Sequence, residues 1–192
     1  MSGPSYFTNA LVYLVDTAFL LLIGAVLLRF LLQWARADFH NPICQLLVRG
    51  TNPCLRPLRR LIPGWGGLDL ASLILAFALQ CLNSAIILLL VGHLLGPLGL
   101  PLYALAELLS KVYYIEIFSL IVVVVGSWIA PGSYSPILEL FRDLVRPLLQ
   151  PLAQRIPSLG GIDFSTFILF VFLQLGLMLI VLPLRGLAVS LG

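Results

Sequence analysis

The stretch that decides the fold is NPICQLLVRGTNPCLRPLRRLIPGWGGLDLAS, residues 41–72, together with its copy SPILELFRDLVRPLLQPLAQRIPSLGGIDFST, residues 135–166. The two align without a gap at a constant offset (135 − 41 = 94). Both copies keep three prolines, an Ile-Pro pair, a Gly-Gly pair and an aspartate in register. Because proline and glycine constrain the path of the backbone, the repeated feature is a path of the chain.

Composition places this repeat in a lipid bilayer. The chain is 60% hydrophobic and 10% charged, whereas a soluble domain is about 45–50% apolar and about 25% charged. A membrane helix needs ~20 apolar residues, and four runs are long enough. We therefore predict an all-α membrane protein built from two tandem repeats, 1–98 and 99–192. The predicted membrane helices are residues 10–34, 70–95, 105–128 and 164–184.

Each repeat carries a bent amphipathic segment between its two membrane helices. We call residues 41–63 the first elbow and residues 135–157 the second elbow. Asn41 before Pro42 is typical of a helix start, and Asn52 before Pro53 predicts a second start, hence two short helices with a break. Arginines on the polar face indicate a segment lying in the membrane interface. In the first elbow these are Arg56, Arg59 and Arg60.

The distribution of basic residues predicts the topology. The loop after the first membrane helix and the loop after the third hold most of the arginines, whereas the opposite side carries only Lys111 and Arg185. By the positive-inside rule both elbows face the cytoplasm and both termini lie outside it. The repeats are then parallel, unlike an inverted-repeat transporter. The first apolar run is too long for a signal-peptide core, and we expect Arg29 to snorkel to the interface.

The elbow motif closely resembles that of the YggT family of small bacterial membrane proteins. The matching residues are Trp34, Asp38-Phe39, Asn41-Pro42, Pro53, Pro57-Leu58-Arg59-Arg60, Ile62-Pro63, Gly66-Gly67 and Asp69. The resemblance covers nearly the whole chain and is to the two-repeat form, which implies a multi-pass protein of the inner membrane. The second copy departs from the motif, with Leu152-Ala153-Gln154 in place of Leu58-Arg59-Arg60.

The resemblance implies little chemistry. Members of the family are linked to osmotic-stress tolerance and potassium uptake in bacteria. Other relatives are linked to cell division, to nucleoid distribution and, in chloroplasts, to assembly of cytochrome b6 with its covalently bound haem. No set of catalytic residues comes with the family.

Polar residues at repeat-related positions are candidates for function. Asp69 and Asp163 follow Gly-Gly-x at a helix start, so each is either an N-cap or a carboxylate that binds a cation or a loop arginine. Gln80 and Gln174 each lie eleven residues further on (80 − 69 = 11), near mid-bilayer. They either hold helices together or line a polar path.

Glu116 is the other intramembrane candidate. It precedes Trp128 by twelve residues (128 − 116 = 12) and so lies within the hydrocarbon, where an ionisable residue is a functional candidate by default. The alternative is a protonated or snorkelling structural glutamate. Lys111, Asp16 and Arg29 are the partners that the sequence offers.

Several classes of function have no support in the pattern. Three cysteines and two histidines lack any metal-ligand spacing, and no nucleophile–base pair or nucleotide fingerprint appears. We therefore expect no catalytic residues, no metal, no cofactor and no nucleic-acid partner.

Two function hypotheses follow. The first is a non-enzymatic membrane organiser or assembly factor that seats its elbow arginines on anionic lipid or a protein partner; alternatively, these arginines only set the topology. The second is an ion-homeostasis protein, a component or modulator of potassium uptake, with a monovalent cation passing the glutamines and Glu116. A pore would require a homo-oligomer, because four helices make a narrow bundle.

Overall fold

The computed structural model describes residues 6–62, 67–93, 95–129, 135–156 and 164–191. Within these ranges the regular elements are all helices, and four helical stretches are long and apolar enough to cross a membrane. This confirms the predicted all-α membrane fold. The stretches are α1 (Tyr6–Trp34), α3 (Leu70–Val91), α4 (Gly99–Ile129), and α6 (Phe164–Gly176) continued through the π-helical turn η1 (Leu177–Val181) into α7 (Leu182–Ser190).

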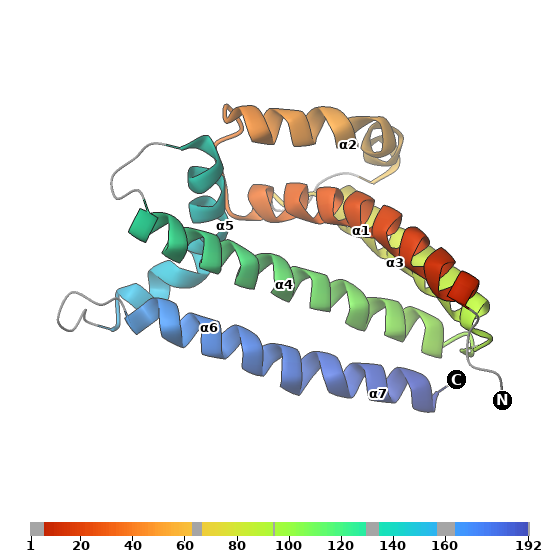
Figure 1. The fold of residues 1–192 in the computed structure, drawn as a ribbon. Coiled ribbons are helices and arrows are strands. Elements are labelled where there is room, and N and C mark those ends of the chain that lie inside the picture. Colours follow the sequence, from red (N-terminus) through yellow and green to blue (C-terminus); the bar gives the residue numbers. More distant parts are fainter. Residues whose placement is uncertain (1–5, 63–66, 94, 130–134, 157–163, 192) are drawn as a thin grey trace.

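The two elbows form α2 (Pro42–Leu61) and α5 (Pro136–Ala153). Figure 1 shows α5, and the start of α2, at the end of the bundle where α1 and α4 terminate; from there α2 runs back over α1. The start of α1 and the end of α7 lie at the opposite end. The first and third membrane helices therefore run in the same direction. This arrangement is that of two parallel repeats.

Several helices run further than the apolar runs suggested. The first begins at Tyr6 rather than at residue 10, and α4 begins at Gly99 rather than at residue 105. The last one continues to Ser190, where the sequence suggested a short tail after Leu184.

Pro183 lacks an N–H and crowds the carbonyl one turn earlier, and the widened turn η1 directly precedes α7. A π-bulge of this kind lets a helix continue past such a residue.

The predicted break in the first elbow is wrong. Asn52 and Pro53 do not start a new helix, because α2 continues through Pro53 and Pro57 as one helix. Asn41 does cap it as predicted, with its side chain accepting a hydrogen bond from the Ile43 amide at 2.9 Å. Figure 1 shows the second half of α2 turning away from the direction of the first. Prolines inside a helix bend it without ending it when other groups satisfy the freed carbonyls.

A tight turn sends the chain from α1 into α2. Arg36 has a φ of 54°, and the amides of Arg36 and Ala37 donate to the carbonyls of Gln33 and Leu32 at 3.1 and 2.9 Å. This is a Schellman motif with arginine at the position that glycine usually occupies. It fixes the point at which the first elbow leaves the bundle.

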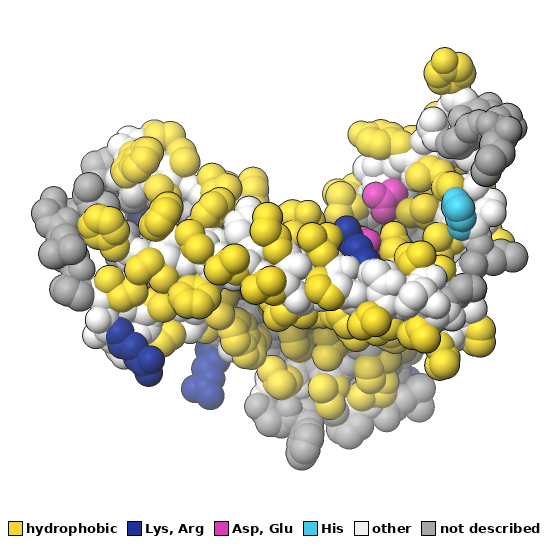
Figure 2. Space-filling model, turned by 90° about the horizontal axis from the view of Figure 1, so that it is seen from below, with side chains coloured by type: hydrophobic (Ala, Val, Ile, Leu, Met, Phe, Trp, Pro, Cys, Tyr) yellow, Lys and Arg dark blue, Asp and Glu magenta, His cyan; other side chains and the backbone are white. Residues whose placement is uncertain are grey.

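Buried apolar side chains fill the bundle interior in three clusters. One joins α1, α3 and α4, and another joins α4, α5 and α6. The third joins the end of α1 to both elbows through Cys44, Leu140 and Leu144. The outer faces are also apolar: Figure 2 shows a surface covered mainly by hydrophobic side chains, with few charges. A protein that is apolar inside and outside is built for lipid surroundings.

Candidate functional site

Asp69, at the start of α3, both caps its helix and pairs with an arginine. Its carboxylate accepts a hydrogen bond from the Ser72 amide at 3.4 Å and forms an ion pair with Arg59. Asp69 is 5% exposed and Arg59 is 38% exposed. Burial acts to raise the pKa of the Asp69 carboxyl, but the hydrogen bonds from Arg59 and Ser72 outweigh it, so the pKa lies below its usual value. Asp69 is therefore both the N-cap of α3 and the partner of a loop arginine.

Arg29 connects the first membrane helix to the elbow. Its side chain is buried, and one guanidinium nitrogen lies 2.7 Å from Thr51 Oγ1, 2.9 Å from Asn52 Oδ1 and 3.2 Å from the Val48 carbonyl. All three acceptors belong to the part of α2 that precedes Pro53, where the helix loses a backbone hydrogen bond. Arg29 was expected to snorkel towards the interface, and its side chain does reach the elbow; there it is buried and bonded to α2, so it fastens α2 to α1.

Three arginines of α2 are left for external contacts. Arg49, Arg56 and Arg60 are exposed and form no ion pair or hydrogen bond within the described part of the chain. Their spacing (49, 56, 60) places them on one helical face. The buried residues Cys44, Thr51 and Leu55 repeat the same spacing on another face. We call Arg49, Arg56 and Arg60 the arginine stripe. Of the sequence candidates, Arg56 and Arg60 belong to it, whereas Arg59 is held by Asp69.

The second elbow lacks this arrangement. Val123 stands where Arg29 would be, and Ala153 and Gln154 replace Arg59 and Arg60. Asp163, the counterpart of Asp69, lies outside the described residues. The helix α5 packs closely against α4, with a side chain of Leu138 directly over Gly126. The arginine-fastened elbow is therefore a property of the first repeat.

The start of the first elbow and the residues just before it contact the second elbow. The Asn41 carboxamide donates to the Pro136 carbonyl at 2.6 Å, and the Asp38 amide donates to the Asp143 carboxylate at 3.4 Å. Arg146, one turn beyond Asp143, pairs with that carboxylate on the surface at 3.3 Å. These contacts fix the first elbow relative to the second.

The intramembrane polar residues do not form one continuous network. Gln80 donates to Ser84 at 3.2 Å within α3, and Asn83 donates to Asp16 of α1 at 3.0 Å. The side-chain oxygens of Gln80 and Asn83 have no partner within the described residues. Asn83 thus holds α1 and α3 together, as expected of a polar side chain in lipid. Gln174 is half-buried in α6 and has no hydrogen bond to the described residues.

Glu116 is isolated. It is 2% exposed, and both carboxyl oxygens lack a hydrogen-bond partner in the described part of the molecule. None of the three suggested partners bonds to it: Arg29 is engaged by α2 and Asp16 by Asn83. Lys111 is half-buried at the side of α4 that faces a small cavity. An unpartnered buried carboxyl is costly unless it is protonated.

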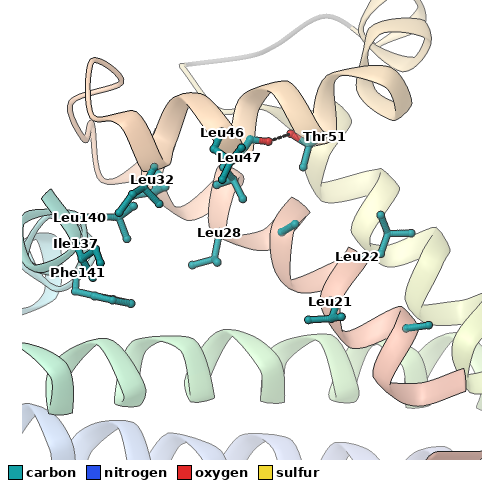
Figure 3. A pocket seen from close by; sticks show the side chains of 14 residues that line it. Leu21, Leu22, Leu28, Leu32, Leu46, Leu47, Thr51, Ile137, Leu140 and Phe141 are labelled. Carbon is teal, nitrogen blue, oxygen red and sulfur yellow. Dashed lines mark hydrogen bonds between the residues drawn. The ribbon is translucent and has the colours of Figure 1, made fainter. Parts of the chain in front are cut away.

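An apolar groove lies beneath the first elbow. It has a volume of about 740 Å³ and is lined by α1, α2 and α5. Figure 3 shows Leu28, Leu32, Leu46 and Leu47 pointing into it, with Phe141 closing one end. The cavity beside Lys111, of about 280 Å³, shares Leu28 and Phe141 with it. Nothing in the sequence indicated this groove, because it depends on how far α2 stands off from α1.

No group of three or more metal-ligating side chains occurs in the described ranges. At the opposite end of the bundle, Arg185 pairs with Glu107 at 2.8 Å and donates to Ser110 at 2.9 Å. This ion pair joins α7, the last helix of the second repeat, to α4, the first helix of that repeat. It holds these two helices together.

The fold and the elbow together define a multi-pass helical membrane protein with two parallel repeats and an arginine-bearing amphipathic helix. The chain belongs to the CCB3/YggT family, whose model matches residues 8–90 and again residues 102–184.

Curated relatives agree with this assignment. The chain is 44% identical to the uncharacterized protein PA0392 of Pseudomonas aeruginosa, over 90% of this chain and 89% of the relative. It is 37% identical to the uncharacterized protein YggT of Escherichia coli K12, over 86% of each. A Vibrio alginolyticus protein encoded in the proC 3′ region is 36% identical, over 86% of this chain and 90% of the relative. No solved structure matches the chain.

Proposed function

We propose that this protein is a non-enzymatic organiser of the inner membrane that presents the arginine stripe of α2 as a fixed docking surface, and that it contributes to osmotic-stress tolerance. The observation that supports the proposal is that the arginines of the first repeat fall into two groups, those bonded within the protein and those left exposed. Arg29 and Arg59 hold α2 to the bundle, while the arginine stripe is left exposed and unpaired. A fixed array of free guanidinium groups at a membrane interface suits anionic groups.

The proposed orientation places both elbows in the cytoplasm and both termini outside it. It is supported by the distribution of basic residues: the elbows that follow α1 and α4 carry most of the arginines, whereas the connections on the other side carry only a paired Arg185 and a single lysine. A reporter enzyme fused after Gly192 tests it: activity is expected on the outer side of the membrane, and cytoplasmic activity would contradict the topology.

The docking role is tested by complementation. In an Escherichia coli strain lacking its own YggT, the wild-type chain is expected to restore growth in high-salt medium. The triple variant Arg49→Gln, Arg56→Gln and Arg60→Gln should not restore it, although it keeps Arg29 and Arg59 and so keeps the elbow fastened.

The matched control removes the same charge from the second elbow. Arg142→Gln, Arg146→Gln and Arg155→Gln together should leave complementation intact. Equal growth of the two triple variants, at equal protein levels in the membrane, would refute a specific role for the arginine stripe.

A second candidate function, ion homeostasis through potassium uptake, is favoured by Glu116. A buried intramembrane carboxyl without partners is suited to bind a cation or a proton transiently. Purified protein in liposomes is the test: a reproducible potassium flux that Glu116→Gln abolishes would support this candidate. If the wild-type protein carries no potassium flux in the same liposomes, the ion-homeostasis function is rejected.

A further inference from the structure

The groove beneath α2 has the dimensions of a lipid chain. It follows α1 from Leu32, near the elbow end, to Ala18. Fourteen residues separate these two positions (32 − 18 = 14), which corresponds to about 21 Å along a helix. The hydrocarbon core is about 30 Å thick, so the groove begins close to the elbow interface and passes the middle of the bilayer.

The lining offers a ligand no polar group. Of the lining residues only Thr51 carries a polar side chain. Its hydroxyl donates to the Leu47 carbonyl at 2.8 Å, as Figure 3 shows, and accepts a hydrogen bond from Arg29. A group that matched this lining would therefore be apolar along its length.

A site for an anionic headgroup adjoins the groove. Leu46 lines the groove and is 72% exposed, which places it at the mouth. Arg49 follows Leu46 by three residues on α2 and is therefore its neighbour on the helix surface. The other members of the arginine stripe, Arg56 and Arg60, continue along the same helix and are equally unpaired. An apolar groove with a free guanidinium group, that of Arg49, beside its mouth matches a molecule with an apolar chain and a phosphate.

We infer that the groove holds one acyl chain of a single anionic phospholipid, whose phosphate lies against the arginine stripe. This inference deepens the proposed docking function and rests on it, since the stripe supplies the headgroup contact. It adds a defined stoichiometry and a requirement for a chain in the groove. A lipid that merely covers the outer surface would need neither.

Gly50 gives a variant that fills the groove without disturbing the fold. It lines the groove, and a Cβ placed on it would meet no atom within 4 Å. Gly50→Leu therefore occupies space meant for the ligand and also favours the helix. Gly186→Leu is the matched control, because a Cβ on Gly186 in α7 also meets no atom within 4 Å and Gly186 does not line the groove.

The experiment is native mass spectrometry of the full chain, released from nanodiscs that contain equal amounts of phosphatidylglycerol and phosphatidylethanolamine. The wild-type chain and Gly186→Leu should each retain one phosphatidylglycerol. Gly50→Leu should retain about tenfold less phosphatidylglycerol, because the added side chain should displace about two methylene groups of the acyl chain from the groove, at about 0.8 kcal/mol each. The triple Arg→Gln variant of the stripe should lose roughly a hundredfold in preference for phosphatidylglycerol.

The outcomes separate this inference from the proposed function. If Gly50→Leu retains lipid like the wild-type chain while the stripe variant fails in complementation, the docking function stands and the groove assignment falls. If the wild-type chain is a dimer that Gly50→Leu dissociates, the occupant is a second copy and the inference is overturned. If Gly50→Leu loses its lipid but the stripe variant complements fully, the groove assignment stands and the proposed function falls.

Discussion

The fastening of α2 by Arg29 yields the sharpest prediction. Replacing Arg29 with methionine keeps most of the apolar stem and removes hydrogen bonds to Thr51, Asn52 and the Val48 carbonyl. The two N–H groups of Arg29 Nη1 serve the three acceptors, and a hydrogen bond from a charged group contributes about 1.5–3 kcal/mol net, so the expected loss is about 3 kcal/mol. The loss should make α2 open more easily. The core of the bundle should keep its stability, because it contains none of these groups.

Hydrogen exchange of backbone amides measures that opening directly. At 1.4 kcal/mol per factor of ten, a loss of about 3 kcal/mol corresponds to exchange about a hundredfold faster in α2. Amides of α4 should be unaffected. The control is Val123→Met, which places the same side chain at the corresponding position of the second repeat. Unchanged exchange in α2 of Arg29→Met would mean that the apolar contacts of Cys44 and Leu55 hold the elbow, and the reasoning would be refuted.

Four further predictions concern stability, measured by thermal unfolding in bicelles. The pKa of Asp69 is lower in the folded state, so its ion pair stabilises the fold above the unfolded pKa of about 3.9 and is lost as the pH falls through the folded pKa; Asp69→Asn should destabilise the protein at neutral pH and flatten this acid dependence. Arg36→Gly should stabilise the turn by about 1 kcal/mol, because glycine adopts a positive φ without steric cost; no gain would argue against strain at a φ of 54°. Gly126→Ala should cost about 1–3 kcal/mol, since its Cβ would lie 2.6 Å from Leu138 Cδ1, and a second change, Leu138→Ala, should recover part of that cost; strictly additive effects would exclude the clash. Glu116→Met should stabilise by about 1–3 kcal/mol by removing an unpartnered buried carboxyl, and a destabilised variant would reveal a partner for Glu116.

Much of the architecture follows from local pattern. Four apolar runs and the repeated prolines of residues 41–72 and 135–166 were sufficient to predict four membrane helices and two parallel elbows. The Asn41 cap was equally local, since a side chain two residues from its partner amide needs no tertiary contact. The same local reasoning failed at Asn52 and Pro53, where a helix start was expected. Arg29, from another helix, donates to acceptors at that point and α2 remains continuous.

The candidate site depended on contacts that a single sequence does not encode by spacing. Arg59 and Asp69 were both identified as candidates, but their pairing depends on the turn that brings α3 back beside the end of α2. That pairing separates Arg59 from Arg56 and Arg60, which look equivalent in the sequence. Arg49 differs from other surface arginines only in its exposure and its lack of partners within the described residues, which the sequence does not show.

The sequence alone determined that this protein crosses the membrane four times, in two copies of one bent unit, because hydropathy and proline placement act over neighbouring residues. Only the tertiary structure decided which arginines are bonded within the protein and which remain free. It alone also created the groove between α1, α2 and α5. These features depend on the distance and angle between helices far apart in the chain. Those quantities are set by the packing of many side chains at once, so no local pattern reports them.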